Sequence, residues 1–191
     1  AYGNFFTGTT VNPRFVVANF DSNTVSVINA STNAVIASPA VGTNPIAVAF
    51  GNVVIGGANT PRFVVANLNS QSVSVLNATN NTIISTIQVG ANPTAIAFGN
   101  NRFAVACNGA NNVTIIEPDF TLNTISTGTN PKSIAFGNNF FAIANFNSAN
   151  VTLINAITLS TTTIAAGTNP IAVAFAGNNR FGVVNNAGAF G

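Results

Sequence analysis

Short apolar segments separated by polar turn residues run along the whole chain. Each segment is about four to seven residues long and rich in Val, Ile, Phe and Thr, with Gly, Asn or Pro at its ends, which is the pattern of short β-strands joined by tight turns. In residues 25–29, Val25 and Val27 alternate with Ser26, as expected for a strand buried on one face. No stretch shows the roughly 3.6-residue period of an amphipathic helix. The pattern predicts an all-β protein.

Four of these segments form a unit that recurs about every 40 residues. The first segment starts with Asn-Pro and occupies residues 44–52, 92–100, 130–138 and, with one inserted residue, 169–178. The second begins at Arg14, Arg62, Arg102, Phe140 and Arg180, and the third at Val25, Val73, Val113 and Val151. The fourth closes on Gly42, Gly90, Gly128 and Gly167. A repeated unit of four short antiparallel strands is typical of a β-propeller blade.

Two features of the first segment predict how the blades are built. Gly-Asn pairs follow it at residues 51–52, 99–101, 137–139 and 177–179, and they predict hairpin turns to the second segment because Gly and Asn tolerate positive φ. Its Phe recurs with the blade period, so we expect these rings in the core between blades: Phe50, Phe98, Phe136 and Phe175.

Three motifs in a fixed order carry a resemblance to a known family. Arg-Phe-Val-Val-Ala-Asn (14–19), Asn-Thr-Val-Ser-Val-Ile-Asn (23–29) and Val-Gly-Thr-Asn-Pro (41–45) are similar to the YVTN repeat of surface-layer-like and YncE-like β-propellers, over residues 11–185. The resemblance implies that the segment after the Pro is the innermost strand of each blade. The Asp that ends the family's third strand is Asn here at Asn29, Asn77 and Asn155, and the family's Pro-Asp-Gly hairpin has become Gly-Asn-Asn. Both changes remove carboxylates and weaken a metal or catalytic role.

We predict a single repeat domain over residues 1–191, an all-β propeller of about four to five four-stranded blades. Three blades are expected to be whole, at 44–91, 92–129 and 130–168, and two partial, at 11–43 and 169–191. Either the last innermost strand joins the first partial blade and closes a four-bladed ring, or the chain is an open arc or fragment. A β-helix or other solenoid is an alternative fold, although its coils would more naturally repeat every 20 residues or so.

The composition bears on partners. Only 4% of the residues are charged and the formal net charge is +2, so the surface has little self-repulsion and association is favoured. Five cations spread along the chain form no patch for nucleic acid. The apolar runs are far shorter than the roughly 18 residues of a membrane-spanning helix, so membrane insertion is not expected.

Few residues of this chain are of the types that support catalysis or bind metals. The chain has no His, which excludes a Ser-His-Asp triad and most zinc sites, and its three acids are Asp21, Glu117 and Asp119. We therefore predict no catalytic, metal or cofactor residues, and a solvated turn at 117–119 rather than a calcium site. Cys107 is expected to be a buried free thiol.

Two recurrent sets of polar residues remain as candidate contacts. Arginines at the start of the second segment would lie in a ring on one face of a propeller and could hold an anionic ligand or glycan: Arg14, Arg62, Arg102 and Arg180. The alternative is that these arginines bind no ligand and simply flank turns. Asn-x-Ser/Thr sequons are candidate glycosylation sites, or products of an Asn- and Thr-rich repeat: Asn29, Asn77, Asn80, Asn112 and Asn150.

These observations favour a non-catalytic scaffold, extracellular or at the cell surface, that self-associates into a larger assembly. The absence of Met at residue 1 fits a processed or excised segment. The alternative is a lectin-like propeller that binds glycans or small ligands through equivalent Asn, Thr and Arg positions. A lactonase-like propeller enzyme is the third hypothesis, and the missing His and scarce acids argue against it.

Overall fold

The computed structural model describes residues 1–7 and 10–186, which form eighteen β-strands and one short 3₁₀ turn, η1 (Phe146–Ser148). Sheet 1 consists of β1 (Tyr2–Thr7), β2 (Thr10–Asn19), β3 (Thr24–Asn29) and β4 (Ala34–Ala37). Sheet 2 consists of β5 (Pro45–Ile55), β6 (Ala58–Asn67), β7 (Ser72–Asn77) and β8 (Ile83–Gln88). Sheet 3 consists of β9 (Pro93–Gly99), β10 (Arg102–Cys107), β11 (Asn112–Ile116) and β12 (Leu122–Ser126). Sheet 4 consists of β13 (Pro131–Gly137), β14 (Phe140–Asn145), β15 (Asn150–Asn155) and β16 (Thr161–Ala165), and sheet 5 of β17 (Pro170–Gly177) and β18 (Arg180–Asn185).

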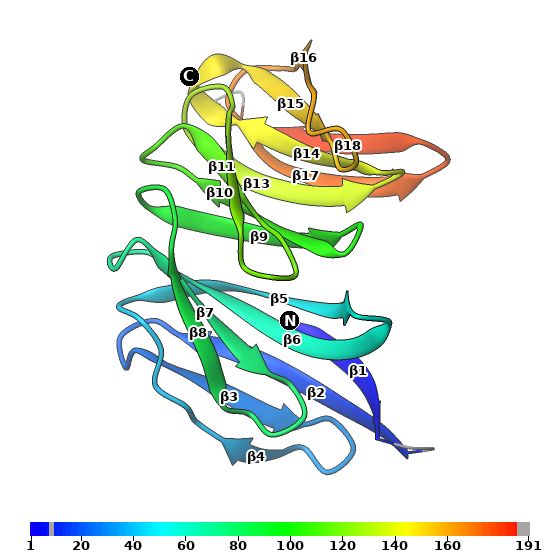
Figure 1. Cartoon of the computed structure of the whole chain (residues 1–191). Helices are drawn as coiled ribbons and strands as arrows, with labels where there is room; N and C mark the ends of the chain where they lie inside the picture. The colour runs from blue at the N-terminus through cyan, green and yellow to red at the C-terminus, as the bar shows by residue number, and fades with distance from the viewer. Residues whose placement is uncertain (8–9, 187–191) are drawn as a thin grey trace.

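The five sheets follow one another in chain order along an arc, with sheet 1 (blue) and sheet 5 (orange to red) at opposite ends (Figure 1). Strands within each sheet are antiparallel neighbours in chain order. Contacts between sheets run through the first strands, from β1 to β5, β9, β13 and β17 in turn, so these strands line the inner side of the arc. This confirms the predicted antiparallel blades and their innermost strands. Among the described residues, sheet 5 has no extensive packing against sheet 1.

The ends of the chain differ from the sequence prediction. Sheet 1 has four strands rather than the partial blade predicted for 11–43, because residues 2–7 form β1 and pair with β2. β17 pairs with β18 in a sheet of its own, so it does not close a four-bladed ring with the strands after Arg14. Separate antiparallel sheets also overturn the β-helix alternative. The missed strand had a signal, since Ala-Tyr-Gly-Asn at residues 1–4 matches Ala-Phe-Gly-Asn at 49–52.

The hairpin turns follow the Asn and Gly residues, with one correction. Both Asn residues of the Gly-Asn-Asn sequences have positive φ, from 46° to 63°, which is the geometry of a tight hairpin turn: Asn100, Asn101, Asn138, Asn139, Asn178 and Asn179. The turn predicted at residues 51–52 is wrong, because β5 continues to Ile55 and Asn52 pairs with Pro61. Gly56 and Gly57, with φ of 57° and 80°, make the turn of this longer hairpin instead.

A Phe-on-Gly contact joins each sheet to the next. The ring of Phe98 in sheet 3 lies so close to Gly51 of sheet 2 that a Cβ on the glycine would overlap it. The same contact recurs at every junction, as Gly3 with Phe50, Gly51 with Phe98, Gly99 with Phe136 and Gly137 with Phe175. Each of these rings also packs on a Phe of the second strand in its own sheet, as in the tilted Phe98–Phe103 pair with centroids 4.8 Å apart. The predicted role of these rings between blades is confirmed.

A glycine is needed for stability where a Phe ring packs against it, and can be replaced where no atom is near. We expect Gly99→Ala to lower the free energy of unfolding by about 1–3 kcal/mol, because the added methyl group forces the Phe136 ring out of place. Gly182→Ala is the matched control in β18, since its Cβ would meet no atom within 4 Å. Denaturant unfolding of both variants measures the difference, and equal stabilities would contradict this account of the junction.

Candidate functional site

Each sheet carries two unlike apolar faces. The second strand of a sheet directs a Phe and a branched residue toward the preceding sheet. In sheet 2 these are Phe63 and Val65, which pack on Val25 and Val27 of sheet 1. Toward the following sheet the second strand directs small residues, as with Ala104 and Ala106, which pack on sheet 4. We call these the preceding face and the following face. Successive sheets therefore join head to tail.

The two end sheets leave one face of each kind exposed in the described structure. On the preceding face of sheet 1, Val17 is 47% exposed, whereas its equivalents Val65, Val105 and Ile143 are 0% exposed. On the following face of sheet 5, Val184 is 57% exposed, whereas its equivalents Ala66, Ala106 and Ala144 are 0% exposed. The exposed faces are thus of the two types that pack together at every junction inside the arc.

A buried Asn ends the second strand and holds the next strand. Asn67 is 0% exposed, and its Nδ2 donates to Oγ of Ser72 at 3.2 Å and to Oγ of Ser74 at 3.0 Å. Asn19 and Asn145 make the same bonds to their third strands. These bonds satisfy the Nδ2 groups, which would otherwise be costly to bury, whereas Oδ1 of Asn67 and Oδ1 of Asn145 are buried without a hydrogen-bond partner in the described structure.

Cys107 takes the place of this Asn in sheet 3. Its Sγ lies 3.7 Å from Oγ1 of Thr114, and a Cβ on Gly90 of the preceding sheet would crowd it, as a Cβ on Gly42 would crowd Asn67. Burial raises the pKa of the Cys107 thiol, against hydrogen bonds with Thr114 and Gly90 that lower it. The thiol is free and buried, as predicted.

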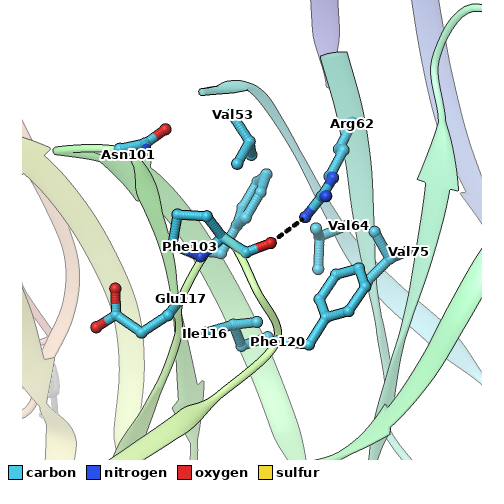
Figure 2. Close-up of a pocket in the computed structure, with 10 residues that line it drawn as sticks. Val53, Arg62, Val64, Val75, Asn101, Phe103, Ile116, Glu117 and Phe120 are labelled. Carbon is cyan, nitrogen blue, oxygen red and sulfur yellow. Dashed lines mark hydrogen bonds between the residues drawn. The ribbon is translucent and has the colours of Figure 1, made fainter. Parts of the chain in front are cut away.

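Arg62 braces the junction of sheets 2 and 3 (Figure 2). Its side chain is 8% exposed, NH1 donates to the backbone oxygen of Pro118 at 3.0 Å, and the guanidinium lies 4.6 Å from the centre of the Phe120 ring. Phe120 adopts a φ of 71°, a left-handed conformation that costs about 1 kcal/mol or more in a residue with a Cβ. The loop at 117–121 thus reaches from sheet 3 to sheet 2, and the cation–π contact holds it there.

The acids of this loop are engaged by residues of the loop or of the neighbouring strands β10 and β12. Oε2 of Glu117 lies 3.4 Å from Nε of Arg102, and Oε1 accepts a hydrogen bond from Nδ2 of Asn123. Asp119 is exposed, and its pKa lies below the ordinary value because the backbone N–H and hydroxyl of Thr121 donate to it. Among the described residues, no three acidic, Cys or His side chains gather as a metal site.

The four equivalent arginines lie in different surroundings. Arg62 and Arg102 hold the loop after β11, Arg14 is half-buried, and Arg180 in β18 is exposed. The structure therefore repeats the backbone position without repeating the side-chain environment. The candidate glycosylation sites also divide. Asn29 and Asn77 end β3 and β7, Asn80 lies in the turn after β7, and the side chains of all three accept hydrogen bonds from backbone N–H groups that follow these strands. Asn112 and Asn150 begin β11 and β15, where a Cβ on Gly90 or Gly128 would meet their Oδ1 atoms.

Two grooves open on the outer part of the arc. A polar groove of about 350 Å³ lies on sheet 2, lined by Asn59, Thr60, Pro61, Arg62, Asn77, Thr79 and Ile84. A more apolar groove of about 430 Å³ lies between β15–β16 and β18. We call it the β18 groove, and its main lining residues are Val151, Leu153, Ile164, Phe181, Val183 and Asn185. No helix in the described part of the chain is long and apolar enough to cross a membrane.

Comparison with known proteins supports the fold. No family model matches the chain, and no curated protein matches it significantly. Among solved structures, it is similar to the WD40 repeats of RRP9 (12% identity, TM-score 0.73, covering 92% of this chain and 56% of that one). It is also similar to streptogramin B lyase (14%, 0.72, covering 94% and 67%) and to BBS1N in a complex with ARL6DN (17%, 0.66, covering 85% and 52%). The chain spans about half to two thirds of these proteins, and its fold is that of a β-propeller.

The brace at Arg62 predicts unequal effects for equivalent arginines. We expect Arg62→Ala to lower the free energy of unfolding by about 1–3 kcal/mol, because it removes a buried charged hydrogen bond and the contact with Phe120. Arg180→Ala removes an exposed side chain and should change stability by less than about 0.5 kcal/mol. Denaturant unfolding compares the two, and equal losses would refute the brace.

Burial of Cys107 predicts a pH effect. A raised thiol pKa means that its contribution to stability is complete below the ordinary value of 9.0 and is lost as the pH rises through the folded-state pKa. The free energy of unfolding should therefore fall above pH 9.0 more steeply in the wild type than in Cys107→Asn, which restores the residue of the other sheets. Parallel slopes in denaturant titrations at increasing pH would show that the thiol is not involved.

Proposed function

We propose that this chain is a non-catalytic interaction scaffold of the YVTN repeat type, extracellular or at the cell surface, whose copies associate head to tail. The observation that carries the proposal is the pair of exposed end faces, because Val17 and Val184 occupy positions that are fully buried at the inner junctions. A surface patch that is complementary to a different patch on the same molecule makes a heterologous contact, which forms rings or filaments. The fold supports a scaffold, and BBS1N, one of the similar structures, was solved in a complex with a protein partner.

The composition supports association and argues against catalysis. With 4% charged residues, two end faces meet with little electrostatic repulsion and little cost from desolvated charge. The chain has no His for general acid–base work, and Glu117 is paired with Arg102 rather than with another acid. The YVTN motifs at 14–19, 23–29 and 41–45 support the family, and with it a surface location.

Light scattering on the purified chain tests the assembly. We expect a mass of several chains at micromolar concentration, largely insensitive to added salt because the end faces are apolar. Val17→Glu should shift the population to monomer, because it places a charge on one end face. Ile157→Glu is the control, since Ile157 is 62% exposed in the turn after β15. A wild-type monomer throughout, or equal effects of the two variants, would rule out head-to-tail association.

The polar groove on sheet 2 favours a second candidate, a lectin-like function. Its amide and hydroxyl groups are of the kind that bind sugar hydroxyls. A glycan array is the direct test, with Asn77→Ala as the variant expected to lose the signal. The absence of any glycan bound at millimolar sensitivity would end this candidate.

A further inference from the structure

The sequence contains a single Asn-Gly pair, at residues 108–109 in the turn between β10 and β11 of sheet 3. The equivalent positions of sheets 1, 2 and 4 hold Phe20-Asp21, Leu68-Asn69 and Phe146-Asn147. Asn followed by Gly is the pair most prone to deamidation, because a Gly without a side chain lets its backbone nitrogen approach the side-chain carbonyl carbon of the Asn. The turn of sheet 3 therefore carries a chemical reactivity that sheets 1, 2 and 4 lack at this position.

Both residues of the pair have a place in the packing of the arc. Nδ2 of Asn108 donates to Oδ1 of Asn130 and, at 3.2 Å, to the backbone oxygen of Pro131. This side chain therefore ties sheet 3 to the start of sheet 4. A Cβ on Gly109 would lie 2.9 Å from Nδ2 of Asn92, so a larger residue would crowd the segment that leads into β9. Two separate contacts thus account for the reactive pair.

The folded turn keeps the two reacting groups in other hydrogen bonds. The N–H of Gly109 donates to the backbone oxygen of Ala91 at 3.0 Å, while the Asn108 amide is bound to Asn130 and Pro131. Deamidation begins when the Gly109 nitrogen attacks Cγ of Asn108, so these hydrogen bonds must break first. The reaction therefore proceeds from a locally opened turn and is slow while sheets 3 and 4 remain joined.

The reaction needs water alone as co-reactant. The Gly109 nitrogen forms a bond to Cγ of Asn108, Nδ2 leaves as ammonia with the proton of the Gly109 N–H, and a succinimide ring results. Water then adds to one of the two ring carbonyls and breaks its bond to nitrogen. The product is an aspartyl or isoaspartyl residue at position 108. One neutral amide is exchanged for one carboxylate, with no oxidation or reduction.

The product lacks the donor that joins the two sheets. A carboxylate only accepts hydrogen bonds, so the bond to the Pro131 oxygen is lost and a negative charge faces that oxygen. Rotation of the Asn130 side chain can present its amide N–H to the carboxylate, but the backbone oxygen of Pro131 cannot change. In the isoaspartyl form the backbone also runs through Cβ and Cγ, which lengthens a turn that packs closely on Asn92. Deamidation therefore weakens the junction of sheets 3 and 4.

We propose that Asn108 is a deamidation site at which opening of the junction between sheets 3 and 4 becomes a permanent loosening. Opening permits the reaction, and the product favours the opened turn, so the change runs in one direction. It adds a fourth acid to a chain that has three and lowers the formal net charge of +2 by one unit. The site is separate from the end faces and from the polar groove on sheet 2, so it does not depend on the proposed function.

Mass spectrometry of digests, taken during incubation in mildly alkaline buffer, measures the site and the rate of the reaction. In denaturant we expect Asn108 to convert faster than any other Asn of the chain. In the native protein its conversion should be at least about tenfold slower, because the turn must open first. Faster conversion of another Asn in denaturant, or equal rates for Asn108 in the two states, overturns the proposal.

A pair of variants tests whether the junction controls the reaction. Asn130→Ala removes an acceptor of the Asn108 amide and should accelerate conversion in the native protein about two- to tenfold. Asn44→Ala is the matched control at the start of sheet 2, because Asn44 and Asn130 both precede a Pro and have φ of 52° and 61°. Equal acceleration by the two variants, or none by either, contradicts control by the junction.

The effect of the product is measured with Asn108→Asp. We expect its melting temperature, followed by circular dichroism, to fall by about 2–4 °C, because the bond to Pro131 is lost. Asn147→Asp adds the same charge at an exposed position of the equivalent turn in sheet 4, and should shift melting by less than about 1 °C. Equal shifts would show that deamidation does not loosen the junction. If Asn108→Asp does not fold, the same comparison is made on wild-type protein before and after conversion of Asn108.

Discussion

The packing of a Phe ring on the glycine of the preceding sheet is the constraint on which the rest of the arc depends. The innermost strands lie close together, and a side chain on that glycine would push adjacent sheets apart. Once the ring is seated, the faces behind it come into contact and bury the apolar core of each junction. Each recurrence of this Phe and Gly in the sequence therefore marks a junction between two sheets.

Polar contacts between side chains in this chain are mostly hydrogen bonds between uncharged groups rather than ion pairs. The buried Asn of the second strand ties two strands of its own sheet, and the closing glycine of the preceding sheet lies against it. Such bonds are insensitive to salt and need no counter-charge, which fits a chain with 4% charged residues. The junction of sheets 2 and 3 is an exception, since Arg62 adds a charged brace there.

Structural features that recur with the blade period were predictable from the sequence, and features that occur in only one sheet were not. The Asn-Asn turns and the rings between sheets follow from residue types that recur at fixed spacing. β1 was missed because no Asn-Pro pair precedes it and Tyr2 stands where the other strands have Phe. The role of Arg62 and the place of the β18 groove depend on how a loop or a sheet meets its neighbour. No local pattern in the sequence carries that information.

Unlike faces on each sheet also determine how stability is distributed along the arc. Each sheet gains its packing from nearest neighbours alone, so the free energy of folding resembles a sum of local couplings rather than the property of one central core. Within the described residues, sheets 2 to 4 pack on a neighbouring sheet at both sides, whereas sheets 1 and 5 pack on one neighbour each. The arc should therefore fray from its ends inward, and any molecule that covers an end would lengthen the cooperative unit by converting a terminal sheet into an interior one.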